Sequence, residues 1–167
     1  MEKSNVILIG MPGCGKSTVG VILAKILGYE FVDTDLLIQK KEEARLEEII
    51  RRVGNEAFLE IEADVCSSLN TRRTVIATGG SAVYSSRAMR HLKETGVVLY
   101  LKVSLEELSL RLNDLKARGV ILPEGAALPE LYEERAELYE KYADLVIEEG
   151  SGGLEETAAR AIEALAQ

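Results

Sequence analysis

A nine-residue stretch from Gly10 to Thr18, with the sequence Gly-Met-Pro-Gly-Cys-Gly-Lys-Ser-Thr, matches the phosphate-binding pattern G-x-x-x-x-G-K-[ST]. The apolar run 6–9 precedes it as a buried strand would, and residues 17–27 follow it with apolar side chains at a helical period. This context constrains the fold strongly, because such a loop joins a buried strand directly to a helix. The alternative, a glycine turn before an ordinary helix, leaves the Lys-Ser pair unexplained.

The residue types of this loop suit the phosphates of a nucleotide. Its glycines permit a tight turn in which consecutive backbone N–H groups face an anion, and the positive end of the following helix adds to the attraction. Lys16 can reach the β- and γ-phosphates, and the hydroxyl of Ser17 can bind Mg²⁺. The predicted nucleotide-binding residues of the loop are Gly13, Cys14, Gly15, Lys16, Ser17 and Thr18.

Composition restricts the classes of function. The chain has 167 residues, 47% hydrophobic and 29% charged, which suits a single domain, 1–167, with its own core. A formal net charge of −8 argues against general nucleic-acid binding, because no basic stripe is available. No apolar stretch approaches the ~20 residues of a membrane span. Residues 1–5 lead directly into the first strand and leave no room for a signal peptide, so we expect a cytoplasmic protein without membrane contact.

Cysteine and histidine are too scarce for a metal cluster or a histidine-based catalytic site. Cys14 and Cys66 are the only cysteines, and two isolated thiols make neither a disulfide framework nor a metal site. Cys14 lies in the phosphate loop, where it is either sensitive to oxidation or simply a small residue that fits. The single histidine, His91, is expected at the surface of a helix.

Strands and helices alternate along the chain. The expected strands are Asn5–Ile9, Glu30–Val32, Thr74–Ala77, Val97–Lys102 and Leu145–Ile147. The expected helices are Lys16–Leu27, Leu36–Lys41, Leu46–Val53, Glu56–Asn70, 86–94, 105–117, Glu130–Ala143 and Leu154–Ala166. This order predicts an α/β chain with a three-layer P-loop fold: a five-stranded parallel sheet, helices on both faces and a lid. The apolar strand at 97–102 is expected in the sheet centre.

An irregular segment interrupts this alternation. Residues 118–129 contain two prolines and two glycines and show no period, and so long an irregular connection is typical of a functional loop. We expect a lid whose Arg118 folds over the transferring phosphoryl group, a simple surface connection being the alternative. The helical segment at 36–62 is expected to bind the substrate.

Polar residues follow the strands at their carboxyl ends, where ligands of parallel sheets bind. That rule places four segments along one rim: 10–17, 33–35, 78–81 and Ser104. Asp33 and Asp35 follow a strand and are expected to project toward this rim on the same side of the chain. One carboxylate can help Ser17 hold Mg²⁺, and the other can accept a proton from a substrate hydroxyl. The alternative is that Asp35 caps a helix and Asp33 is exposed.

Two further features have a functional and a structural interpretation. Gly79 and Gly80 follow a strand and allow a substrate to approach the backbone closely, although a plain turn also explains them. Arg135 lies in the helix after the irregular segment. A solvated ion-pair face is as natural there as a substrate contact, because the neighbouring acidic residues are Glu133, Glu134 and Glu137.

Together these pieces resemble the shikimate kinase family of P-loop proteins, nearly from end to end. The matching residues are Gly10–Thr18, Asp33-Thr34-Asp35, Gly54, Phe58, Glu62, Gly79-Gly80, Arg118, 134–139 and Ala143-Asp144. The resemblance implies transfer of the γ-phosphoryl group of ATP to a ring hydroxyl of shikimate, with Mg²⁺ as the metal. It also implies a small-molecule substrate and a monomer.

The resemblance assigns roles in the nucleotide half of the site. Lys16 and Arg118 stabilise the transferring phosphate, Ser17 binds Mg²⁺ with Asp33 nearby, and Arg111 lies against the adenine. In this chain the lid arginine is followed by Gly-Val-Ile instead of proline and two leucines, and the usual adenine-side loop is replaced by residues 150–153.

The resemblance also assigns the acceptor half. Asp35 binds the acceptor hydroxyls and acts as base, the backbone at Gly79 and Gly80 contacts the substrate, and Arg135 binds its carboxylate. Leu59 stands where the family usually has an arginine that also clamps this carboxylate, and leucine cannot donate a hydrogen bond.

Two other features of the acceptor half follow from this departure. Glu62, the usual neighbour of the missing arginine, is expected to repel a carboxylate, and Ser81 replaces a third glycine and narrows the backbone freedom there. The possible substitutes for the missing clamp are Arg45, Arg51 and Arg52.

Three functions are therefore considered. The first is shikimate phosphorylation, and the second is phosphorylation of a different hydroxylated metabolite, for which Leu59 is the motive. The third is a nucleotide-binding regulatory protein without catalysis. The complete set of base, metal ligand and lid arginine disfavours this last function.

Overall fold

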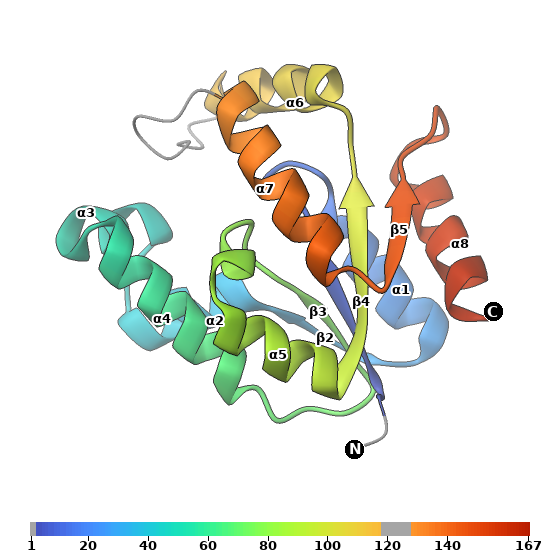
Figure 1. The fold of residues 1–167 in the computed structure, drawn as a ribbon, viewed down its shortest axis with the longest axis horizontal. Coiled ribbons are helices and arrows are strands. Elements are labelled where there is room, and N and C mark those ends of the chain that lie inside the picture. The colour runs from blue at the N-terminus through green and yellow to red at the C-terminus, as the bar shows by residue number, and fades with distance from the viewer. Residues whose placement is uncertain (1–2, 118–127) are drawn as a thin grey trace.

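The computed structural model describes residues 3–117 and 128–167, and Figure 1 shows a twisted sheet with helices in front of it and behind it. The five strands pair in parallel in the order β2-β3-β1-β4-β5. They are β1 (Asn5–Ile9), β2 (Glu30–Asp33), β3 (Thr74–Ala77), β4 (Gly96–Lys102) and β5 (Leu145–Glu148). The predicted α/β P-loop fold with a five-stranded parallel sheet and helices on both faces is confirmed.

The strand at the centre of the sheet is β1, and the prediction that β4 occupies this place is wrong by one position. Ile7 of β1 lies opposite both Ile76 of β3 and Val98 of β4. Every residue of β1 is buried, whereas Val97 and Lys102 of β4 are partly exposed, so the longer apolar run is not the more deeply buried one. The central place of β1 puts the loop that follows it at the middle of the sheet's carboxyl edge.

The helices divide between the two faces. They are α1 (Lys16–Leu27), α2 (Thr34–Glu42), α3 (Leu46–Val53), α4 (Asn55–Ser68), α5 (Ser86–Thr95), α6 (Leu105–Ala117), α7 (Leu128–Tyr142) and α8 (Gly153–Leu165), with a single 3₁₀ turn η1 (Ala82–Tyr84). α1 and α8 pack together on one face, and α5 and α7 contact β4 from the other (Figure 1). α7 begins two residues before the predicted start, so the last two residues of the predicted lid are helical. The rest of that lid, 118–127, lies outside the described residues.

Two apolar clusters hold the elements together. The larger one joins the sheet to α1, α5, α7 and α8. The smaller one consists of Ile38, Ile49, Phe58 and Val65, and it joins α2, α3 and α4 beside the β2 edge of the sheet (Figure 1). The segment 36–62, predicted to bind the substrate, thus lies within a packed unit of three helices with its own apolar contacts.

His91 lies on a helix, α5, as predicted, and it is partly exposed at the surface. Its side chain is half-buried, and its Nε2 atom lies 2.6 Å from the carbonyl oxygen of Leu69. The reason is that α5 packs directly against α4, so the side of α5 that carries His91 contacts the end of α4.

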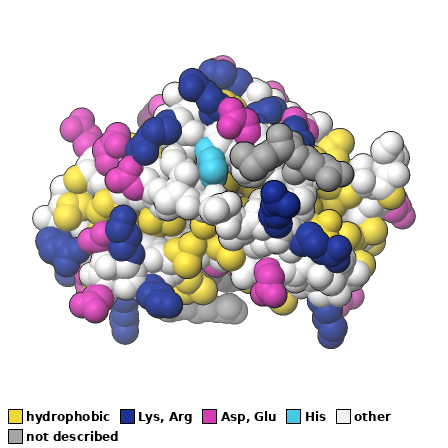
Figure 2. All heavy atoms as spheres, turned by 90° about the horizontal axis from the view of Figure 1, so that it is seen from below, with side chains coloured by type: hydrophobic (Ala, Val, Ile, Leu, Met, Phe, Trp, Pro, Cys, Tyr) yellow, Lys and Arg dark blue, Asp and Glu magenta, His cyan; other side chains and the backbone are white. Residues whose placement is uncertain are grey.

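The surface shown in Figure 2 carries basic and acidic side chains side by side, with apolar groups between them. Within 3–117 and 128–167, no helix combines the length and the apolar character that crossing a bilayer requires.

Candidate active site

The phosphate loop joins β1 to α1 in the conformation that its glycines predict. Gly10, Gly13 and Gly15 have φ angles of 149°, 80° and 94°, in the region that other residues rarely adopt. Gly15 also precedes the first residue of α1, and a Cβ atom there would strike the side chain of Leu154. The loop therefore depends on glycine both for its turn and for its close packing against α8.

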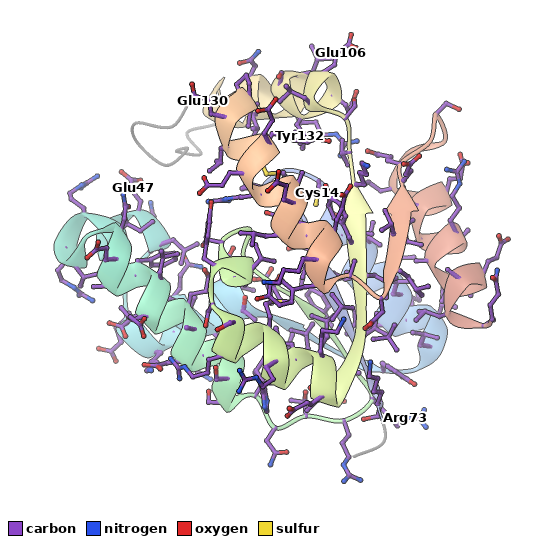
Figure 3. The ribbon with its side chains drawn as sticks, viewed as in Figure 1. Cys14, Glu47, Arg73, Glu106, Glu130 and Tyr132 are labelled. Carbon is purple, nitrogen blue, oxygen red and sulfur yellow. The ribbon has the colours of Figure 1, made fainter. Side chains whose placement is uncertain are left out.

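Lys16 is buried inside this loop, with 9% of its surface exposed. Its Nζ donates hydrogen bonds to the carbonyl oxygens of Gly10 (2.7 Å) and Met11 (2.9 Å). Both acceptors are neutral, so the positive charge stays available to an anion in the loop. Figure 3 shows Cys14 at the end of the sheet near α6 and α7. Its side chain is buried with 1% exposure, which favours the interpretation that it is a small residue filling the loop.

Asp33 connects the loop to the next strand. Its Oδ2 accepts a hydrogen bond of 2.7 Å from the hydroxyl of Ser17, while its Oδ1 accepts from the backbone N–H groups of Asp35 (2.9 Å) and Leu36 (3.3 Å). Asp33 thus caps α2, so the alternative in which Asp35 is the capping residue is wrong. A hydroxyl and a carboxylate oxygen beside a phosphate loop are the hard ligands that Mg²⁺ uses together with phosphate and water oxygens. The residues therefore fit this metal.

Asp35 follows the strand as predicted, and it is the second residue of α2. The strand ends at Asp33 because that residue caps the helix. The side chain of Asp35 is half-buried, and within the described residues no group donates a hydrogen bond to its carboxylate. Burial raises its pKa, as does the negative charge of Asp33, and Lys16 opposes this rise. The carboxylate is thus free to accept a hydrogen bond from a ligand.

Gly79 is the point where two carboxylates converge. A Cβ atom on this residue would lie 2.8 Å from Oδ1 of Asp35 and would overlap Oε2 of Glu62. The backbone N–H of Gly79 donates to the hydroxyl of Thr34 at 3.1 Å, which fixes the end of β3 against the start of α2. Glycine is therefore required here by the close approach of side chains, and the plain-turn interpretation is insufficient.

Arg135 lies next to Gly80, the following residue, and is not part of a surface ion-pair face. It is buried with 6% exposure, and its Nε donates to the hydroxyl of Tyr84 at 3.3 Å. A Cβ atom on Gly80 would lie 2.9 Å from its Nη1. Within the described residues no carboxylate lies within 4.0 Å of its guanidinium. The interpretation of Arg135 as a solvated surface residue is wrong, because the side of α7 that carries Arg135 packs against η1.

The two remaining arginines of the predicted site are Arg111 and Arg118. Arg111 lies against the phosphate loop, since its Nη1 donates to the carbonyl oxygen of Gly13 at 3.2 Å. It also pairs with Glu107 (3.0 Å) and Glu149 (2.5 Å). Arg118 lies outside the described residues.

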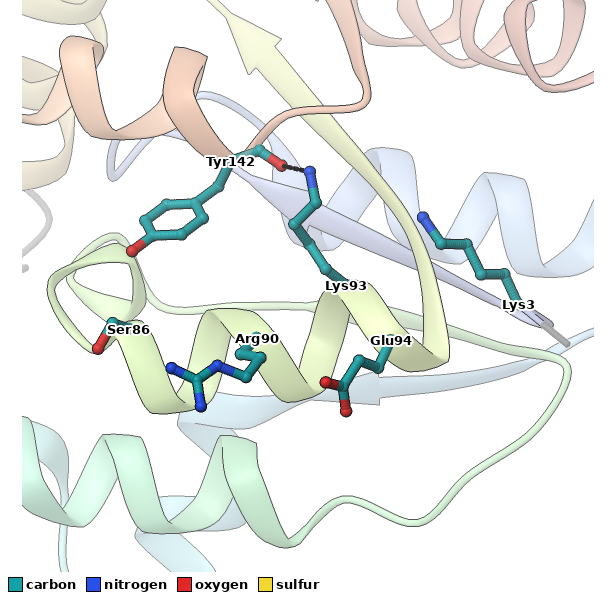
Figure 4. Close-up of a pocket in the computed structure, with 6 residues that line it drawn as sticks. All are labelled: Lys3, Ser86, Arg90, Lys93, Glu94 and Tyr142. Atoms are coloured by element: carbon teal, nitrogen blue, oxygen red, sulfur yellow. Dashed lines mark hydrogen bonds between the residues drawn. The ribbon is translucent and has the colours of Figure 1, made fainter. Parts of the chain in front are cut away.

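A hollow at the opposite end of the sheet is not part of this site. It is lined by Lys3, Ser86, Arg90, Lys93, Glu94 and Tyr142 (Figure 4). Lys3 precedes β1 and Glu94 precedes β4, so the hollow lies at the amino ends of strands whose carboxyl ends carry the loop. Its cations are partly neutralised, because Lys93 pairs with Asp144 at 3.0 Å and Lys3 pairs with the same carboxylate at 3.6 Å.

Comparison with known proteins decides the family. A family model described as shikimate kinase matches residues 12–166. A shikimate kinase of Clostridium botulinum (strain Loch Maree / Type A3) is 40% identical over 141 residues, which cover 82% of this chain and 83% of the relative. The chain belongs to the shikimate kinase family. A shikimate kinase of Nitrosospira multiformis is 38% identical over 149 residues, covering 87% of this chain and 76% of the relative.

Solved structures of the family agree with this assignment. The shikimate kinase from Acinetobacter baumannii in complex with shikimate is 31% identical and superimposes with a TM-score of 0.88, covering 99% of this chain and 94% of that one. The enzyme from Aquifex aeolicus is 29% identical, with a TM-score of 0.81. The first of the three predicted functions is confirmed: the chain is a shikimate kinase, a phosphotransferase with an alcohol acceptor that uses ATP and Mg²⁺.

The link between Glu62 and Ser81 in this member of the family was not predicted from the sequence. Glu62 of α4 is buried with 1% exposure, and the hydroxyl of Ser81 donates a hydrogen bond of 2.5 Å to its Oε1. The helical spacing of Phe58, Glu62 and Val65 was an available signal, because it puts Glu62 on the buried face of α4. Ser81 has a φ angle of −94°, which any residue adopts. The turn therefore does not need a glycine at this position.

Leu59 stands in place of the arginine that forms the family's second carboxylate clamp. None of the three arginines considered as substitutes is buried at the site. The side chain of Leu59 is half-buried on α4. Arg51 pairs with Glu47 at 2.5 Å and Arg52 pairs with Glu42 at 3.1 Å, both from exposed positions. Arg45 is also exposed. These three side chains belong to the surface of the α2–α4 unit.

The buried carboxyl of Glu62 predicts a dependence of stability on pH. Burial raises its pKa from 4.5 to about 7, and the charge of Asp35 adds to the rise. Ser81, Arg135 and Lys16 oppose it. At pH values between 4.5 and about 7, the carboxyl of Glu62 has lost its proton in the unfolded chain but keeps it in the folded chain. Stability therefore falls as pH rises from about 5 to 7, and the full cost remains above 7.

We expect Glu62→Gln to remove this cost. The gain in unfolding free energy over the native chain should be larger at pH 8 than at pH 5 by up to about 3 kcal/mol, at about 1.4 kcal/mol for each pH unit between the two pKa values. Urea unfolding at the two pH values measures the difference. Glu60→Gln, on the exposed side of the same helix, is the matched control and should show none. An equal gain at both pH values would contradict the assignment of a raised pKa.

Proposed function

We propose that this chain performs the shikimate kinase reaction with Asp35 as the base and Arg135 as the anchor for the carboxylate of the acceptor. One observation supports this division most strongly. Arg135 is a buried cation for which the described residues offer no carboxylate partner, and a buried charge is stable only when it is paired. The carboxylate of shikimate supplies the missing partner when the acceptor is bound.

The spacing of the two groups suits a small acceptor. Oδ1 of Asp35 approaches Gly79, and Nη1 of Arg135 approaches Gly80. These glycines are consecutive, with Cα atoms about 3.8 Å apart, so a hydroxyl and a carboxylate on one small ring can reach both groups. In this arrangement the backbone at Gly79 and Gly80 forms the floor beneath the acceptor.

The proposed chemistry begins with removal of a proton. Asp35 takes the proton of an acceptor hydroxyl as its oxygen attacks the γ-phosphorus of ATP, and the bond from that phosphorus to the bridging oxygen breaks to release ADP. Lys16 offsets the charge that develops on the phosphoryl oxygens, and Arg118 is proposed to do the same. Ser17 and Asp33 would hold Mg²⁺, which neutralises the charge of the phosphates. Arg111, beside Gly13, is proposed to contact the adenine.

We also propose that the chain acts as a cytoplasmic monomer on a small molecule. Its net charge of −8 supports the proposal that it has no nucleic-acid partner, because phosphate-rich partners are repelled.

The acceptor is tested by release of ADP from MgATP with and without shikimate, beside a Leu59→Arg variant. We expect shikimate-dependent turnover in the native chain and a KM for shikimate that is about 10- to 100-fold lower in the variant. The reason is that a charge-assisted hydrogen bond to a carboxylate contributes about 1.5–3 kcal/mol. Leu59→Met, which adds no donor, is the control and should match the native chain.

Other outcomes would redirect the proposal. Turnover with another hydroxylated metabolite, together with no response to shikimate, would identify a different acceptor and would explain Leu59. Tight MgATP binding with no acceptor-dependent turnover in either form would favour a regulatory role.

A further inference from the structure

Glu62 and Arg135 are opposite charges buried beside one short segment, Glu62 next to Gly79 and Arg135 next to Gly80. Glu62 is 1% exposed and Arg135 is 6% exposed. Each charge acts on the other, because the guanidinium lowers the pKa that burial raises in Glu62. The two side chains nevertheless form no ion pair within 4.0 Å. In a medium of low dielectric an unhindered pair of this kind would be expected to close.

The hydroxyl of Ser81 donates to Oε1 of Glu62 at 2.5 Å, and the other oxygen of Glu62 lies against Gly79. A serine hydroxyl is a neutral donor, so it satisfies the carboxylate without adding a charge that would compete for the acceptor. Arg135 keeps Tyr84 as a neutral partner, at 3.3 Å from its Nε.

We infer that Ser81 is a positioning residue that holds Glu62 away from Arg135 and thereby keeps the guanidinium available to the carboxylate of the acceptor. The inference rests on the proposed role of Arg135 and extends it to a residue that touches no reacting atom. Without the Ser81 hydroxyl, Glu62 turns to Arg135 and becomes an internal competitor of the substrate. The effect then falls on the binding of the acceptor, because Arg135 is proposed to bind the acceptor and not the nucleotide.

Competition by Glu62 depends on its ionisation. The described groups that act on its carboxyl are Asp35 from α2, Arg135 from α7 and Lys16 from the start of α1. Cys66, one turn further along α4, is neutral because burial raises the pKa of its thiol to about 12. Since the pKa of Glu62 is about 7, its negative charge grows between pH 6 and 8. Competition for Arg135 should therefore strengthen across this range.

A double-mutant cycle on Ser81 and Glu62 tests the inference. We expect Ser81→Ala to raise the KM for shikimate about tenfold at pH 8, which is the change that loss of one hydrogen bond to a charged group produces, and to raise it less at pH 6. The KM for ATP and kcat should stay within about twofold of native. In the Glu62→Gln background the same substitution should change the KM for shikimate less than twofold, because a neutral amide carries no negative charge with which to compete for Arg135.

Conservative variants guard against a purely structural effect. Ser81→Thr keeps the hydroxyl and should restore the native KM, and Ser81→Gly serves in place of Ser81→Ala if that variant does not fold. An equal rise in KM in both Glu62 backgrounds, or no rise in the native background, would overturn the inference. Arg135→Met separates the two proposals: an unchanged KM for shikimate in this variant would refute the anchoring role of Arg135 itself.

Discussion

Replacing Asp35 by asparagine is expected to lower kcat by about 10²- to 10⁴-fold, the usual contribution of a positioned base. Asparagine keeps the shape of the side chain and can still accept a hydrogen bond from the acceptor hydroxyl, but it cannot take the proton. The fold should tolerate the change, because Asp35 repels both Asp33 and Glu62 and its removal relieves that repulsion. The Kd for MgATP should stay within about twofold of native.

Single-turnover phosphoryl transfer and equilibrium binding of MgATP to the same preparation separate these effects. Asp64→Asn is the matched control, since Asp64 is an exposed carboxylate on α4 that pairs with Arg87 at 2.8 Å. It should leave both quantities unchanged. If Asp35→Asn weakened MgATP binding as much as it slowed transfer, Asp35 would have a structural role at the start of α2 and not a catalytic one.

The fold was predictable because its strongest signals are local. The loop from Gly10 to Thr18 determines a strand before it and a helix after it, and each later strand ends in polar residues at one rim. The order of the strands was harder to predict. β4 has the longest apolar run, yet β1 occupies the centre, because strand order depends on how the crossover helices pack and not on the hydrophobicity of any one strand.

The site was predictable only where the chain itself brings residues together. Ser17 and Asp33 end up 2.7 Å apart because the phosphate loop after β1 and the end of β2 lie at the same edge of the parallel sheet. The contact between Ser81 and Glu62 joins the start of η1 to the middle of α4, and it depends on how α4 packs against η1. No periodic pattern reports such a contact. The same holds for Arg135, whose acidic neighbours in the sequence suggest a surface position while its packing against Tyr84 buries it.

Replacing Lys16 by methionine is expected to lower kcat/KM for ATP by about 10²- to 10³-fold, with losses in both binding and transfer. Methionine fills a similar volume but carries no charge, so the loop keeps its shape and loses its attraction for the phosphates. Lys16→Arg should recover only part of the loss. The buried ammonium contacts the carbonyl oxygens of Gly10 and Met11 from a single point, and a planar guanidinium cannot occupy that place without moving the loop.

Binding of MgATP and single-turnover transfer, measured on both variants, test this expectation. Lys25→Met is the control, because Lys25 lies on the same helix with its side chain exposed, and it should behave as the native chain does. A weaker Kd with an unchanged rate of transfer at saturating MgATP would mean that Lys16 attracts the nucleotide without stabilising the transition state. Native binding and native transfer in Lys16→Met would refute the assignment of this loop as the phosphate site. The roles proposed for Ser17, Asp33 and Asp35 would then lose their basis, because all three are placed relative to the phosphates that this loop is inferred to hold.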